Sequence, residues 1–168
     1  MTQSHEISAA DASVLRLQDR AEISDVQLRY ATGTDSHDWE LFRDCFTDEV
    51  EVDFSEGFGQ PVVRLSADDW VRVTAPRMES FKATQHMITN LAITFDGDDR
   101  ATCTAYVRAS HHLPNNTGDS DLIVYGYYTN RFERTANGWR IAKVKLTALW
   151  MTGNFGILQT VLSEVPTQ

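Results

Sequence analysis

The sequence lacks the features that mark nucleic-acid-binding, membrane and secreted proteins. Its 24 acidic side chains outnumber 15 basic ones among 168 residues, and no basic run could neutralise a phosphate backbone. No apolar run approaches the roughly 20 residues that cross a bilayer. The opening stretch MTQSHEISAADAS lacks the basic and apolar regions of a signal peptide. We therefore expect a cytoplasmic protein with neither nucleic acid nor membrane as a partner.

Cysteine is also scarce, because the chain holds only Cys45 and Cys103. These two show none of the clustered spacing of a zinc site or a disulfide framework, so we interpret both as reduced packing residues. No set of ligating side chains recurs at metal spacing, and we expect no metal and no cofactor. The remaining composition, 42% hydrophobic and 23% charged, is that of one folded domain over residues 1–168 with a core at about 10–155.

The first half of the sequence has helical periodicity. Apolar residues recur at helical spacing from about residue 10 to Gly33, where the glycine is predicted to end the helix. A short second helix after the N-cap Asp38 is predicted to bury an aromatic edge that extends to Phe46. The segment VEVDF alternates as a half-buried strand. A third helix is predicted to begin after Ser66 and to end or kink at Pro76.

From residue 83 onward the pattern changes to four long β-type runs, at 83–95, 100–112, 121–134 and 139–151. The links FDGDD and TANGW contain Asp-Gly and Asn-Gly, which favour tight hairpins. Three helices followed by a curved antiparallel sheet predict an α+β fold in which the helices cover one face of the sheet. A sheet wrapped around helices leaves a cone-shaped hollow that suits a small ligand.

The order of these elements and several short motifs carry a family resemblance. Over residues 15–152 the chain resembles the SnoaL-like, or nuclear-transport-factor-2-like, superfamily. The segments DSHDWELFR, TQHMI and VRASHH resemble scytalone dehydratase, while bile-acid 7α-dehydratase and hexachlorocyclohexane dehydrochlorinase share an aspartate and histidine pair. The resemblance implies a cone-shaped fold, a homo-oligomer (a trimer in preference to a dimer) and a cofactor-free lyase that eliminates water or HCl.

The resemblance also implies catalytic residues. Asp35 matches the family aspartate that orients a catalytic histidine, and His86 in TQHM matches that histidine. Tyr30 matches a tyrosine of the bile-acid enzyme. His111 matches the second histidine of the scytalone enzyme, and Arg108 matches an arginine three residues before it.

Four further residues are predicted to contact a substrate. Phe54 stands where the scytalone enzyme has a strand tyrosine. Asn90 follows His86 on the same face of a regular strand and is predicted to add a polar contact inside the cone. The phenols of Tyr125 and Tyr128 are candidate hydrogen-bond donors to a developing enolate.

Histidine suits the removal of a proton from carbon, because its ordinary pKa of about 6.5 lies near neutral pH. A buried carboxylate would fix its tautomer and stabilise the imidazolium. We therefore expect a dehydratase-like lyase for a small hydrophobic cyclic or aromatic/polyketide-like substrate, with His111 or a tyrosine handling the leaving group. An isomerase or polyketide cyclase with the same base, and a noncatalytic ligand-binding or oligomer-building module, remain alternatives. Asp35 could instead cap a helix, and His86 could be a satisfied core histidine.

Overall fold

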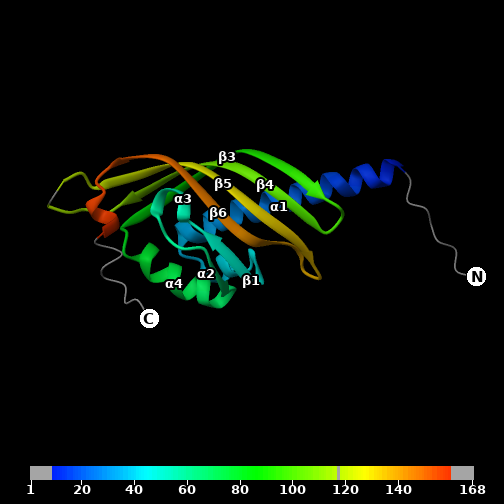
Figure 1. Cartoon of the computed structure of the whole chain (residues 1–168), viewed down its shortest axis with the longest axis horizontal. Coiled ribbons are helices and arrows are strands. Elements are labelled where there is room, and N and C mark those ends of the chain that lie inside the picture. Colours follow the sequence, from blue (N-terminus) through cyan, green and yellow to red (C-terminus); the bar gives the residue numbers. More distant parts are fainter. Residues whose placement is uncertain (1–8, 117, 160–168) are drawn as a thin grey trace, which may run out of the picture.

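The computed structural model describes residues 9–116 and 118–159. The elements are α1 (Ala9–Ser36), α2 (Trp39–Arg43), β1 (Phe46–Asp53), α3 (Ser55–Phe58), β2 (Val63–Ser66), α4 (Ala67–Glu79), β3 (Ala83–Asp96), β4 (Arg100–His112), β5 (Asp121–Thr135) and β6 (Gly138–Gly153). The strands form one curved sheet with α1, α2 and α4 on one side of it (Figure 1). The predicted α+β class is confirmed.

The sheet has the strand order β2-β1-β6-β5-β4-β3. The four predicted β runs are present as β3 to β6 and pair as long antiparallel neighbours. Strand β1 pairs with β6 in a parallel orientation, on the edge of β6 that faces away from β5. Neither α3 nor β2 was predicted, because both are very short and lie in a stretch punctuated by glycine and proline.

Helix α1 continues to Ser36, so the prediction that it ends near Gly33 is wrong. A methyl group at Gly33 would lie 2.9 Å from the backbone nitrogen of Phe42, and glycine therefore permits the close approach of α1 and α2. Asp35 consequently lies inside the last turn of α1 and does not cap a helix start. Asp38 caps the second helix, as predicted, because its carboxylate accepts a hydrogen bond from the backbone amide of Leu41 at 2.9 Å.

The core between helices and sheet is rich in aromatic rings. Phe46 opens β1 instead of extending the second helix, because α2 is only five residues long. It still packs edge-on against Phe42, with ring centroids 5.0 Å apart. Cys45 and Cys103 are free and fully buried, and burial raises their pKa to about 12 and about 11, as expected for packing residues.

Helix α4 positions one wall of the site described below. The hydroxyl of Ser66 caps it by accepting the amide of Asp69 at 3.0 Å. Pro76 does not end the helix, which continues to Glu79 and so includes Arg77 in its last turn. Proline is tolerated there because it removes a single helical hydrogen bond close to the helix end. Within the described residues, no helix is long and apolar enough to cross a membrane.

Candidate active site

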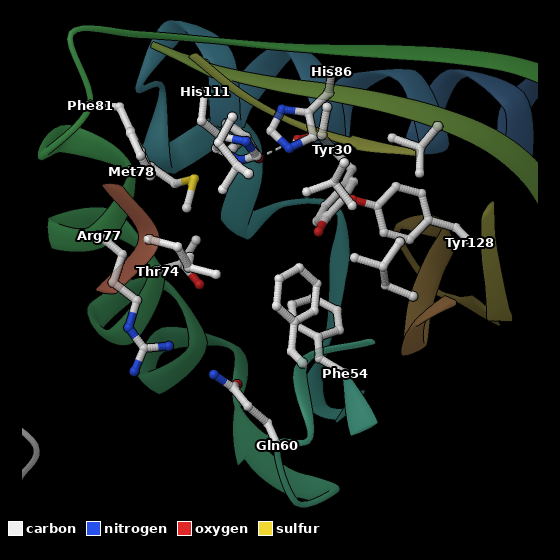
Figure 2. Close-up of a pocket in the computed structure, with 18 of the residues that line it drawn as sticks. Tyr30, Phe54, Gln60, Thr74, Arg77, Met78, Phe81, His86, His111 and Tyr128 are labelled. Atoms are coloured by element: carbon white, nitrogen blue, oxygen red, sulfur yellow. Dashed lines mark hydrogen bonds between the residues drawn. The ribbon is translucent and has the colours of Figure 1, made fainter. Parts of the chain in front are cut away.

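A cavity of about 140 Å³ lies between the concave face of the sheet, the end of α1, helix α4 and the segment around α3 (Figure 2). Its apolar lining includes Phe54, Phe58, Val107, Leu122, Val124, Leu146 and Leu158. An apolar cavity of about 150 Å³ is known to hold benzene, so this one suits a single-ring molecule. Five predicted site residues line it: Tyr30, Phe54, His86, His111 and Tyr128.

Asp35 and His86 form a hydrogen-bonded pair beside this cavity. The Nδ1 atom of His86 lies 2.7 Å from Oδ1 of Asp35, and the backbone N–H of His86 donates to Oδ2 at 2.6 Å. The hydroxyl of Thr84 donates to Oδ1 at 2.8 Å. Because Nδ1 faces a carboxylate, we assign the single proton of the neutral imidazole to Nδ1. This leaves Nε2 as the basic atom of the ring.

The electrostatics keep the Asp35 carboxylate charged. Burial alone would raise the pKa of Asp35, but the His86 ring, the His86 amide and the Thr84 hydroxyl together outweigh it, and the pKa lies below its ordinary value. The side chains of His86 and Asp35 are 9% and 22% exposed, so bulk water screens the pair only weakly. A negative charge is therefore fixed against the imidazole.

His111 is the second histidine of the cavity. Its ring lies 5.7 Å from that of His86 at an angle of 83°, and 4.9 Å from that of Phe81. Burial and the neighbouring His86 lower the pKa of His111 to about 4, so this ring is neutral at pH 7. His112 lies on the opposite face and contacts Asp121 at 2.6 Å. Of these two histidines, His111 is the one that lines the cavity.

Tyr30 and Tyr128 pack edge to face, with ring centroids 5.6 Å apart. Burial raises the pKa of Tyr128 to about 12 and that of Tyr30 well above its ordinary value, so both phenols keep their protons. After burial, the neighbouring Tyr128 side chain also contributes to the raised pKa of Tyr30.

Arg108 and Tyr125 lie on the outer face of the sheet and are not among the residues that line this cavity, contrary to expectation. Arg108 follows the cavity residue Val107 on β4, and neighbouring strand residues point to opposite faces. Its guanidinium donates to the Ser110 hydroxyl at 2.8 Å and lies 5.7 Å from the centre of the Tyr125 ring. Tyr125 in turn stacks on Trp150 at 4.7 Å.

Asn90 is also outside the cavity, contrary to prediction. The pairing of β3 with β4 changes register between Thr89 and Ala92, and Asn90 adopts a left-handed backbone with φ of 55°. This β-bulge reverses which residues point inward, so Leu91 and Ile93 face the core after it. Asn90 is exposed.

Sequence reasoning missed the contribution of α4. Trp70, Thr74 and Arg77 line the cavity, together with Gln60 from the loop before β2. The three α4 residues are spaced by four and three positions, so they share one helix face. This helical spacing of Trp70, Thr74 and Arg77 can be read from the sequence, and it could have identified them as one face of the helix.

The fold and the cavity define a class: a cone-shaped α+β protein that encloses a small-molecule site. The family model described as SnoaL-like domain matches residues 15–145. The chain therefore belongs to the SnoaL-like family.

Several solved structures are similar over most of the chain. The Kfla4162 protein from Kribbella flavida is 36% identical, with a TM-score of 0.81 over 86% of this chain and 99% of that one. A scytalone dehydratase candidate from Novosphingobium aromaticivorans is 20% identical, with a TM-score of 0.74 over 84% and 91%. The hexachlorocyclohexane dehydrochlorinase LinA-type3 from Novosphingobium barchaimii is 20% identical, with a TM-score of 0.70 over 86% and 95%. The last two share the fold alone, and no curated protein matches the chain.

Proposed function

We propose that the protein is a cofactor-independent lyase that eliminates water from a small, hydrophobic, cyclic molecule. The observation that carries this proposal is the 2.7 Å contact between His86 and Asp35 beside a largely apolar cavity. Proton removal from carbon is favoured by a base that is oriented and shielded from water, and the buried, carboxylate-bound ring of His86 supports this role.

The reaction begins when Nε2 of His86 takes a proton from the carbon next to a carbonyl group. The electron pair of the C–H bond forms an enolate, while the charged Asp35 stabilises the imidazolium. The enolate then collapses to form a carbon–carbon double bond. The bond to the hydroxyl group on the next carbon breaks, and hydroxide leaves with the bonding pair.

We assign the stabilisation of the enolate oxygen to two groups that line the cavity, the hydroxyl of Tyr128 and the neutral ring of His111. Neither is suited to give up its proton, because burial raises the pKa of Tyr128 to about 12 and leaves His111 uncharged. We therefore assign the return of the proton to His86. Its imidazolium protonates the leaving hydroxide, releases water and becomes neutral again. This replaces the expectation that His111 or a tyrosine protonates the leaving group.

A simple assay tests the proposed reaction. 3-Hydroxycyclohexanone is a single-ring ketone whose dehydration gives a conjugated enone, which can be followed by ultraviolet absorbance and mass spectrometry. We expect the wild type to dehydrate it and His86→Ala to be inactive. A product of unchanged mass would favour an isomerase, and binding without any turnover would favour a noncatalytic module.

We also propose that the protein self-associates through the outer face of its sheet, as a trimer in preference to a dimer. The outer aromatic patch, defined as Met87, Tyr106, Tyr125, Leu149 and Trp150, supports this. Four of its members are strongly exposed, with relative exposures of 49% for Met87, 57% for Tyr106, 59% for Leu149 and 55% for Trp150. Large apolar side chains that are exposed on a sheet are a feature of protein interfaces.

A further inference from the structure

Three residues of α4 that line the cavity each carry a buried polar atom without a hydrogen-bond partner among the described residues. These atoms are Nε1 of Trp70, Oγ1 of Thr74 and Nε of Arg77. Trp70 and Thr74 are only 6% and 8% exposed, so bulk solvent does not satisfy them. Leaving buried polar groups unpaired is costly. Three such groups on one helix face therefore indicate a ligand that completes them.

The chemistry of these groups specifies the ligand. The indole and guanidinium nitrogens only donate hydrogen bonds, and the threonine hydroxyl also donates. Arg77 forms no ion pair among the described residues, whereas Arg72 on the same helix contacts Asp69 at 2.6 Å. Glu79 lies in the same turn as Arg77 but does not pair with it, and its carboxylate accepts a hydrogen bond from the indole N–H of Trp39 at 2.7 Å. A wall of donors that carries one free cation selects an anionic acceptor.

We propose that Trp70, Thr74 and Arg77 form an anchor for a carboxylate group on the ligand. A carboxylate has two oxygens that accept a pair of donors at once, and it balances the charge of Arg77. Figure 2 shows Arg77 and Gln60 toward one end of the cavity and His86 and His111 toward the other. A ring bound by its carboxylate at the α4 anchor would therefore extend toward the histidines.

This inference narrows the substrate class and rests on the proposed lyase function only in calling the ligand a substrate. The expected substrate is a single-ring carboxylic acid whose reacting carbon lies on the far side of the ring from the acid group. The cavity of about 140 Å³ leaves little room for a second ring.

The test compares benzoate with benzamide, which has nearly the same shape but no charge, by isothermal titration calorimetry. Wild-type protein is expected to bind benzoate about tenfold or more tightly than benzamide. Arg77→Met should abolish this preference, because it should weaken the binding of benzoate and leave the binding of benzamide unchanged. Arg72→Met removes the same charge from an arginine of α4 that does not line the cavity, and it should leave the preference intact. Thr74→Val should reduce the preference by a smaller factor.

His86→Ala separates this inference from the lyase proposal, because it should lose turnover and keep the preference for benzoate. The anchor is refuted if wild type binds the two molecules equally, or if benzoate shows no saturable binding up to about 10 mM. It is also refuted if Arg72→Met and Arg77→Met weaken benzoate equally. Thermal unfolding checks each variant, and Arg77→Gln, which should likewise lose the preference, replaces Arg77→Met if the latter does not fold.

Discussion

The Nδ1 atom of His86 lies 2.7 Å from Oδ1 of Asp35, although 51 positions separate the two residues in the chain. Asp35 lies in the last turn of α1, and His86 lies on β3, an edge strand of the sheet. The same carboxylate accepts the backbone N–H of His86, so it orients the ring and also satisfies part of an otherwise open strand edge. One side chain thus joins the helix, the sheet and the candidate base.

Replacing Asp35 by Asn should lower the dehydration rate of 3-hydroxycyclohexanone by about a hundredfold or more, because the imidazolium loses its counter-charge. The free energy of unfolding should fall by about 1–3 kcal/mol, since an amide cannot accept all three hydrogen bonds. Asp38→Asn is the matched control. Asparagine also caps helices well, so that variant should keep both activity and stability. Equal rates for the two variants would contradict the assigned role.

His111 predicts how stability depends on pH. Its folded pKa of about 4 lies below the unfolded value near 6.5, so the unfolded chain binds a proton that the folded protein excludes. The contribution of His111 to the free energy of unfolding is therefore fully present above about pH 6.5. It is lost as the pH falls toward 4, and the loss reaches about 3 kcal/mol. Denaturant unfolding from pH 4 to 7 should show a flatter dependence for His111→Gln. His112→Gln, at an exposed histidine, should leave the steep dependence unchanged, and a steep His111→Gln curve would refute the prediction.

Asn90 should tolerate glycine but not a β-branched residue, because its φ is 55°. We expect Asn90→Gly to change the free energy of unfolding by less than about 0.5 kcal/mol. Asn90→Val should cost about 1–2 kcal/mol. Thr89→Val, at the neighbouring regular strand position, is the control and should be nearly neutral. Equal stability of Asn90→Val and Thr89→Val in denaturant titrations would mean that the bulge is absent.

The outer aromatic patch should hold the oligomer together. Trp150→Glu places a charge at the exposed ring that stacks on Tyr125, so the variant should be monomeric in size-exclusion chromatography with light scattering. Leu17→Glu introduces the same charge at an exposed leucine of α1 and should leave the oligomer unchanged. An oligomer that survives Trp150→Glu, or a wild type that is already monomeric, would exclude this interface.

The fold could be predicted from the sequence because its long strands and tight turns carry strong, local signals. The long β runs and their Asp-Gly and Asn-Gly turns agree with β3 to β6 to within two residues. Tyr30, Asp35 and His86 were found through motif resemblance. Their proximity could not follow from spacing alone, because it depends on how the end of α1 packs on β3.

The errors have distinct physical causes. Strict alternation already separates Tyr125 from Tyr128 and Arg108 from His111, so the sequence itself argued against placing all four in one cavity. Asn90 is different, because the bulge that turns it outward has no glycine to mark it. The α4 wall was missed because its helix was predicted to end or kink at Pro76, one residue before Arg77.

The most direct test of the candidate base is the exchange of α-protons of cyclohexanone for deuterium, followed by proton NMR in D₂O. Cyclohexanone has no leaving group, so this experiment isolates proton removal from the later steps. Wild-type protein should accelerate exchange well above the buffer rate, Asp35→Asn should lose about a hundredfold of that acceleration, and His86→Ala should lose all of it. Equal exchange rates for wild type and His86→Ala would contradict the role of His86 as the base.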